Sequence, residues 1–352
     1  MPITVIYPCS DDPADMKRLD KVLYGQLFDV KYQVIHDMSA LNGLQGQQLL
    51  FAVPLGKYGI NSEYARLLLQ LRSRSDLFEG CTSAIIIDGE SEFFTKSTAT
   101  ELAFAVNNAG SALIGRPLVE GTGSLVNYRI QAKVMGVDLK GAYMAAVRDL
   151  VVRLVTLKPV SNKRPKLLVL HASNHRTSNT LQLWDKLSQK ISNAIEVREL
   201  CLRNGTISDC AGCPYTMCLH FGEKGRCFYG GVMQEEVWPA VMESDGLMML
   251  CPNYNDALSA NLSAFINRLT GLFRQKRFYE KVLFSIIVSG YSGGDIVARQ
   301  VISALNMNKS FYLPAHFAML ETANDPGEAL ALPGIGDRLD QFALSIKKVL
   351  CG

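Results

Sequence analysis

The chain has 352 residues, of which 48% are hydrophobic and 20% charged, enough for the cores of two domains and too apolar for a disordered chain. Its formal net charge of +3 is too small to indicate a protein that binds nucleic acid. No run approaches the roughly 20 apolar residues of a membrane helix, and the first residues lack the basic start of a signal peptide. We therefore expect a cytoplasmic protein without a membrane segment.

The first half alternates short β-branched runs with amphipathic stretches. Five strands are expected at residues 3–8, 31–38, 48–55, 83–89 and 111–118. Helices are expected at 14–27, 61–78 and 97–109, followed by a long helix that ends near Val155. The stretch 156–166, with two prolines and several cations, reads as a linker.

The second half repeats this alternation. Its strands are expected at 166–173, 195–202, 246–254, 282–290 and 311–320. Its helices are expected at 180–192, 258–273, 294–306 and 336–350. The glycine-rich stretch 203–232 shows little apolar periodicity, and we expect it to be a loop inserted between the second and third strands.

Strands that alternate with helices predict βαβ units on a parallel sheet. We expect an α/β protein of two tandem flavodoxin-like domains, each a five-stranded parallel sheet with helices on both faces. The expected boundaries are 1–155 for the first domain, 156–165 for the linker and 166–352 for the second domain. Similar spacings of the strand-ending prolines and glycines in the two halves favour an internal duplication.

The segment HASNHRTSNT at 171–180 carries polar groups where a strand passes into a helix. Its hydroxyl, amide and cationic side chains belong to Ser173, His175, Arg176, Ser178, Asn179 and Thr180. Free N–H groups at a helix N-terminus favour an anion such as phosphate. The alternative is that these residues merely cap the helix.

Two later loops follow the third and fourth strands of the same half. Their residues are Pro252, Asn253, Tyr254 and Asn255 in the first loop, and Ser289, Gly290, Gly293 and Gly294 in the second. Ligands of an open parallel sheet lie outside the carboxyl ends of its strands, so all three loops are expected at one site. Aromatic side chains and exposed main-chain amides there suit a planar heteroaromatic ring.

Nine cysteines are present, and four of them form a C-x2-C-x4-C-x8-C pattern in the inserted segment. These four are Cys210, Cys213, Cys218 and Cys227. Four thiolates could ligate a [4Fe–4S] cluster or a zinc ion. The same four residues could instead stay as free thiols or form a disulfide.

Taken in order, LVLHASNHRTSNT, DCAGCPYTMC and MLCPNYNDALSANLSAFINRL resemble the NADPH-dependent FMN reductase family over residues 166–320, on the side of its iron–sulfur flavoproteins. The resemblance implies that Ser173, Ser178, Asn179 and Thr180 hold the FMN phosphate, that 252–255 line the flavin ring and that 289–294 close over it. The chain departs from the family at Ala172, where glycine is usual, and at His175, where the family has arginine. The spacing before its third cysteine, Cys218, is also two residues longer than in the iron–sulfur flavoproteins.

The resemblance implies an FMN-dependent NAD(P)H oxidoreductase, with a nicotinamide nucleotide as co-substrate and an electron acceptor that the sequence does not identify. Because the flavin carries the chemistry, no catalytic side chain is named. An iron–sulfur cluster, if present, would relay electrons to a partner. The alternative function is a flavodoxin-like electron carrier or binding module that does not react with NAD(P)H.

The first half is expected to be a degenerate copy that binds no flavin. Asp11 and Asp12 stand where a phosphate loop would begin, and Asp88, Glu90 and Glu92 crowd the fourth strand's loop. Carboxylates at these places would repel a phosphate. Such a copy could pair with the second domain as an internal pseudo-dimer; the alternative is that whole chains form a homodimer.

Overall fold

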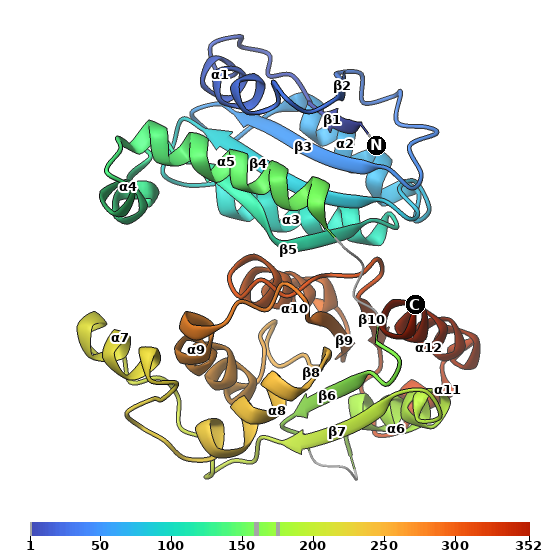
Figure 1. Ribbon diagram of the computed structural model, residues 1–352. Coiled ribbons are helices and arrows are strands. Elements are labelled where there is room, and N and C mark those ends of the chain that lie inside the picture. The colour runs from blue at the N-terminus through green and yellow to red at the C-terminus, as the bar shows by residue number, and fades with distance from the viewer. Residues whose placement is uncertain (1, 158–161, 174–176) are drawn as a thin grey trace. The chain divides into compact units, whose positions relative to one another are not determined.

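The structure is a computed structural model that describes residues 2–157, 162–173 and 177–352. The chain divides into two units, residues 1–158 and 159–352, each with its own sheet (Figure 1). The units are described separately below.

The first unit is built on five parallel strands in the order β2-β1-β3-β4-β5. The strands are β1 (Ile3–Ile6), β2 (Tyr32–Ile35), β3 (Gln48–Leu55), β4 (Thr82–Gly89) and β5 (Ala112–Gly121). The helices are α1 (Lys17–Gln26), α2 (Ser62–Ser73), α3 (Thr95–Asn108), α4 (Arg129–Met135) and α5 (Leu139–Thr156), with a short 3-10 turn at Val126–Tyr128. Helices α1 and α5 pack together over one sheet face, and α2 and α3 pack together over the other.

The second unit has the same topology, with the order β10-β9-β8-β6-β7. Its strands are β6 (Lys166–His171), β7 (Glu196–Cys201), β8 (Gly246–Pro252), β9 (Val282–Ser289) and β10 (Ala318–Thr322). Its helices are α6 (Asn179–Ile191), α7 (Tyr215–Glu223), α8 (Trp238–Glu243), α9 (Ala260–Gln275), α10 (Gly294–Val301), α11 (Glu328–Ala331) and α12 (Ile335–Cys351). Two π-helical segments, Met233–Val237 and Ile302–Met307, adjoin α8 and α10.

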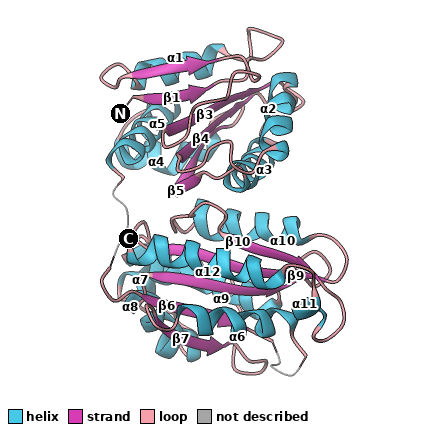
Figure 2. Ribbon diagram, turned by 90° about the vertical axis from the view of Figure 1, so that its right-hand side faces the viewer, coloured by secondary structure: helices cyan, strands magenta, loops and turns pink. Residues whose placement is uncertain are grey.

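The central strands are continuous apolar runs in the sequence because helices bury both of their faces. Every residue of β9 is buried, as are all residues of β8 except its last. Helices α6 and α12 lie together on the face turned toward the viewer in Figure 2. Their apolar stripes, with Trp184 and Phe342 among them, form one core with β6, β8 and β9.

The predicted fold class is confirmed: both units are five-stranded parallel α/β sheets with helices on both faces, in the flavodoxin-like order. The strand expected at 311–320 begins only at Ala318. Before it, Tyr312 makes a single bridge to Val282, and Pro314 has no N–H with which to continue a ladder. Among the described residues, no helix combines the length and apolarity needed to cross a membrane.

The expectation of a loop throughout 203–232 is wrong, because α7 lies within it. This helix packs against α9, and Gly222 lets the two backbones approach, since a Cβ there would collide with the Arg274 side chain. Tertiary packing, rather than a local apolar period, therefore stabilises the helix.

Candidate functional site

Three loops meet at the carboxyl edge of the second sheet. They follow β6, β8 and β9, which are neighbours in the sheet. The order reverses between β6 and β8, and such a switch point is where open α/β sheets bind ligands. The three loops singled out from the sequence are therefore placed at one edge.

The loop after β6 presents hydroxyl groups at the start of α6. The Ser173 Oγ is buried and has no hydrogen-bond partner among the described residues. Ser178 is the N-cap of α6, where its Oγ accepts from the Leu181 N–H at 3.4 Å and lies 2.7 Å from the Thr180 Oγ1. The predicted His175 and Arg176 fall outside the described residues. This loop therefore offers an unpaired hydroxyl beside a helix N-terminus.

The Asn179 side chain is engaged within the protein. Its Nδ2 donates to the backbone oxygens of Ala323 and Asp325, and its Oδ1 accepts from the N–H groups of Gly327 and Ala329. The amide thus ties α6 to the segment after β10. Asn179 has only its backbone N–H to offer to a ligand, which sequence reasoning did not anticipate.

The loop after β8 is a tight hairpin. Tyr254 and Ala257 exchange two backbone hydrogen bonds of 3.1 and 3.2 Å, and the two residues between them, Asn255 and Asp256, have φ values of 52° and 58°. Two consecutive positive φ values are those of a type I′ turn, which asparagine and aspartate tolerate better than most residues. The turn leaves the Tyr254 ring 55% exposed beside Pro252.

The loops after β8 and β9 are fastened together. The Asn253 Nδ2 donates to the Ser289 Oγ at 3.2 Å and to the Ser292 backbone oxygen at 3.0 Å. Gly293, at φ 84°, lies so close to Asp256 that a Cβ would collide with the carboxylate. The two loops therefore form one preorganised wall. The Asn253 Oδ1 is buried in it without a partner among the described residues.

Sequence reasoning missed Gln300, which supports this wall from α10. Its Nε2 donates to the Asp256 backbone oxygen at 2.8 Å, and its Oε1 accepts from the Leu258 N–H at 3.1 Å. A glutamine within an amphipathic helix gives no sequence signal for this role. Gly290 and Gly294 were both predicted as site residues. Gly290 contacts the Asn324 side chain, and Gly294 is the first residue of α10 and lies close to the Ser289 Oγ.

The four cysteines of the inserted segment line one cavity of about 130 Å³, which we call the thiol pocket. Its other lining residues include aromatic rings and two arginines, Arg226 and Arg268, and no carboxylate. These four cysteines are free thiols. Over the described ranges, no three His, Cys, Asp or Glu side chains are placed to hold one metal ion. The predicted metal ligation by Cys210, Cys213, Cys218 and Cys227 is thus not supported, and we derive no step through a metal.

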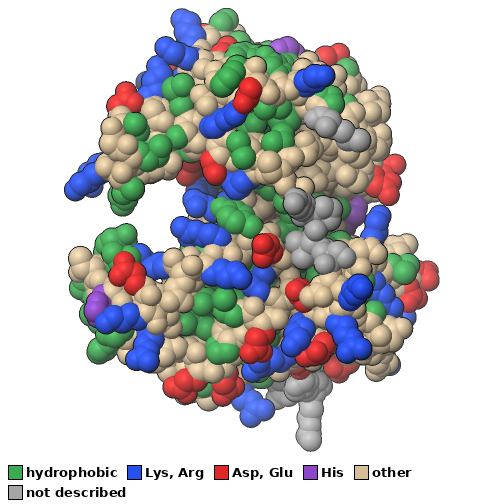
Figure 3. Space-filling model, in the orientation of Figure 1, with side chains coloured by type: hydrophobic (Ala, Val, Ile, Leu, Met, Phe, Trp, Pro, Cys, Tyr) green, Lys and Arg blue, Asp and Glu red, His purple; other side chains and the backbone are tan. Residues whose placement is uncertain are grey.

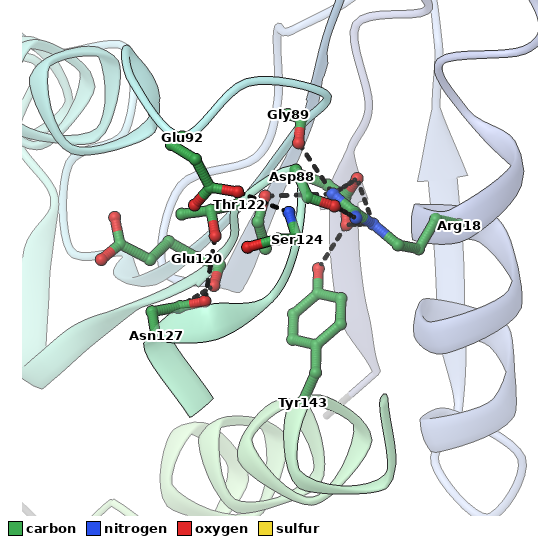
Figure 4. A network of polar contacts seen from close by, with 11 residues as sticks. Arg18, Asp88, Gly89, Glu92, Glu120, Thr122, Ser124, Asn127 and Tyr143 are labelled. Carbon is green, nitrogen blue, oxygen red and sulfur yellow. Dashed lines mark hydrogen bonds and ion pairs between the residues drawn. The ribbon is translucent and has the colours of Figure 1, made fainter. Parts of the chain in front are cut away.

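The corresponding edge of the first unit is closed by an internal ion pair (Figure 4). From α1, the Arg18 Nε donates to both oxygens of Asp88 at 3.0 and 3.1 Å, and its other nitrogens donate to the backbone oxygens of Gly89, Gly121 and Gly123. The Tyr143 hydroxyl also donates to Asp88, which is 3% exposed. Burial raises the pKa of Asp88 more than these contacts lower it.

This geometry corrects the interpretation of Asp88 as a free repelling charge, because its carboxylate is buried and paired. Glu90 and Glu92 are exposed, and Glu92 accepts from the Ser124 N–H at 2.6 Å. Asp11 and Asp12 are exposed as well; Asp11 accepts from the Ser62 Oγ beside the N-terminus of α2.

The second unit is similar to proteins of known function. Residues 165–325 match the family model of NADPH-dependent FMN reductases. The matched segment lies within the second unit. The match supports a flavin-dependent NAD(P)H oxidoreductase, as the sequence predicted. The match supports neither the iron–sulfur branch of the family nor a common origin of the two units.

Several solved structures are similar to about half of the chain, which is roughly the length of one unit. An azoreductase from Bacillus anthracis str. Sterne covers 52% of this chain and 99% of its own, at 15% identity and a TM-score of 0.40. RosB, solved with bound 8-demethyl-8-formylriboflavin-5'-phosphate, covers 51% of this chain and 76% of its own, at 17% identity and a TM-score of 0.39. An NAD(P)H:quinone oxidoreductase from Methanothermobacter marburgensis covers 51% and 95%, at 12% identity and a TM-score of 0.38. No curated protein matches the chain.

Proposed function

We propose that the second unit binds one FMN at the carboxyl edge of its sheet and uses it to carry electrons from NADH or NADPH to an acceptor. The observation that carries the proposal is the buried Ser173 Oγ, which has no partner among the described residues and lies in the loop that leads to α6, within the segment that matches the family model. A buried hydroxyl without a partner is costly, and a ligand that accepts its hydrogen bond removes that cost.

The phosphate would lie at the start of α6. The Ser173 and Ser178 hydroxyls and the backbone N–H groups of Asn179 and Thr180 are the donors available there. The partial positive charge of a helix N-terminus favours an anion at this place. These donors would hold and orient the dianionic phosphate. The segment 171–180 contains no Asp or Glu whose charge would repel it.

The ring would lie against the wall formed by the loops after β8 and β9. The wall is fixed by Asn253, Gln300 and the close contact at Gly293, so little order has to be gained on binding. The buried Asn253 Oδ1 is an acceptor for a ring N–H, and the Tyr254 ring offers an exposed aromatic face.

When bound, FMN supplies the hydride and electron chemistry. The chain's own residues bind and orient it, and no acid or base among them is required. An iron–sulfur centre is left out of this proposal, because no three ligating side chains in the described parts of the chain are placed for a metal.

Anaerobic mixing of the FMN-loaded full chain with NADH or NADPH tests the function. A reductase loses its visible flavin absorbance on mixing. An electron carrier that does not react with NAD(P)H keeps its colour until dithionite is added. A chain that binds no FMN at all contradicts both functions.

Ser173→Ala tests the phosphate end of the site. We expect the Kd for FMN to rise roughly 10-fold or more, since a hydrogen bond to a charged group contributes about 1.5–3 kcal/mol. Ser188→Ala is the control, because Ser188 lies near the C-terminal end of α6, away from the loop that holds Ser173, and its Oγ donates to the Asp185 backbone oxygen. Equal Kd values for the two variants in a fluorescence titration would argue against the placement of the phosphate.

A further inference from the structure

The thiol pocket gathers cysteines from three consecutive pieces of chain. Cys210 and Cys213 precede α7, Cys218 lies on it and Cys227 follows it. The segment packs on α9, and Figure 3 shows side chains of hydrophobic, basic, acidic and histidine residues over its α7 part. Four thiols on one small cavity allow pairs of sulfur atoms to meet, which cysteines scattered over a surface could not do.

A buried cation without a counter-ion lies in the wall of this pocket. Arg268 on α9 is 4% exposed, and its guanidinium donates to the backbone oxygen and Oγ of Ser208 and to the backbone oxygen of Gly230. All of these acceptors are neutral, and its buried Nε has no hydrogen-bond partner within the described part of the chain. Among the ion pairs of the described residues, none includes Arg268.

A buried charge is costly unless an anion pairs with it. The nearby Asp209 carboxylate accepts from the Asn267 Nδ2 and the Cys210 N–H and does not line the thiol pocket. The acidic groups that line the pocket together with Arg268 are the thiols and the Tyr229 hydroxyl. A thiolate in the pocket would therefore gain a charge-assisted contact. Thiolates, rather than thiols, are the nucleophiles of disulfide exchange.

Two contacts indicate which cysteines are close together. The same Arg268 guanidinium bonds to Ser208 and Gly230, so it joins the stretch before α7 to the stretch after it. Cys213, Cys227 and Tyr229 line the same cavity, and the charge of the neighbouring Cys213 is the largest cause of a raised pKa of Tyr229. Cys213 and Cys227 thus come from the two stretches that Arg268 joins.

We propose that the thiol pocket is a dithiol–disulfide centre in which Cys213 and Cys227 exchange with small disulfides, and that Arg268 favours the reactive thiolate. The Cys213 thiolate attacks one sulfur of the small disulfide, which forms a mixed disulfide and releases one small thiolate. The Cys227 thiolate then attacks the Cys213 sulfur and releases the second. Two electrons pass from the pair to the small disulfide, and the two thiol protons go to the released thiolates.

The proposal is independent of flavin binding, since the exchange needs only the thiols and the small disulfide. Its structural consequence is a covalent link between the stretches before and after α7. That link would hold the cysteine segment on α9, the helix that begins directly after the ring-binding loop.

Glutathione disulfide is the probe, applied to the full chain purified without oxygen. Trypsin cuts after Lys224 and Arg226, so Cys213 and Cys227 fall in different peptides, and mass spectrometry without reduction detects the link between them. We expect the link in the wild type and in Cys201→Ser, a control outside the pocket. We expect Cys213→Ser and Cys227→Ser to lack it and to stop at mixed disulfides with glutathione.

Arg268→Gln should form the link roughly 10-fold more slowly, a factor that corresponds to about 1.4 kcal/mol of lost stabilisation of the thiolate. Arg268→Lys keeps the charge and should retain most of the rate, with circular dichroism showing that both variants are folded. Equal rates for Gln and wild type would overturn the role of Arg268. Stoichiometric iron or zinc in the purified chain, or oxidation that spares Cys213 and Cys227, would overturn the centre itself.

Discussion

A single side chain, Arg18, occupies the carboxyl edge of the first unit's sheet, where the second unit is proposed to bind its ligand. Its guanidinium makes five hydrogen bonds to the ends of β4 and β5 and the loops after them, so the space between α1 and these strand ends is filled by protein. Asp88, which the sequence presents as one more acidic loop residue, is instead the buried anion that pairs with Arg18.

Arg18→Met would leave the buried Asp88 carboxylate without its cation. We expect the free energy of unfolding at neutral pH to fall by about 3–5 kcal/mol. Since burial already raises the pKa of Asp88, its contribution to stability falls as pH rises through the folded-state pKa, and removing Arg18 raises that pKa further. The loss should therefore shrink as pH falls and Asp88 takes up a proton.

Urea unfolding followed by circular dichroism measures this effect; Trp184 and Trp238 are both in the second unit and do not report on the first. Arg66→Ala is the control, since Arg66 is 74% exposed and its pair with Glu63 contributes little. A loss that is the same at every pH would mean that Asp88 is not the group left unpaired.

At the scale of elements, the hairpin after β8 is a preorganised part of the proposed flavin site. Its shape depends on positive φ values at two neighbouring non-glycine residues, and its position depends on Asn253 and Gln300. A loop so fixed can present an aromatic ring and free amides without ordering on binding.

Asn255→Val should strain this hairpin, because a β-branched residue at φ 52° costs roughly 1–2 kcal/mol. Asn255→Gly adopts the same φ freely and should change the stability of the second unit by less than about 0.5 kcal/mol. Tryptophan fluorescence during urea unfolding compares the two variants without FMN. If Val and Gly are equally stable, the turn is not constrained as described.

At the scale of the whole molecule, one topology occurs twice with two different sheet edges. In the second unit the edge carries a buried hydroxyl with no partner among the residues that the structure describes, and a wall of loops held by hydrogen bonds. In the first unit the edge carries exposed carboxylates and the Arg18–Asp88 pair. Equal folds therefore do not imply equal ligands.

We accordingly expect FMN to saturate the chain at one molecule per chain. Asp11 and Asp12 are exposed where a phosphate would lie in the first unit, and the guanidinium of Arg18 is already engaged. Titration of the FMN-free chain, followed by quenching of flavin fluorescence, measures the stoichiometry. Saturation at two molecules per chain would show that the first unit also binds flavin.

The sequence by itself determined the α/β architecture of both units and the similarity of the second unit to NADPH-dependent FMN reductases. Apolar runs such as β8 and β9 alternate with amphipathic helices in the sequence. This pattern predicts the fold because both faces of a parallel sheet must be covered by helices. The order of three loops after β6, β8 and β9 was sufficient to place them at one edge, because parallel strands end on the same side.

Only the tertiary structure decided which groups in those loops are free. The Asn179 side chain is hydrogen-bonded to the segment after β10, and Gln300 is hydrogen-bonded to a loop far from it in sequence. Asp88 forms an ion pair with Arg18 on α1. Helix α7 and the meeting of four thiols around Arg268 likewise depend on packing against α9. Hydrogen bonds and ion pairs between distant residues follow from the packed geometry, and no local pattern in the chain encodes them.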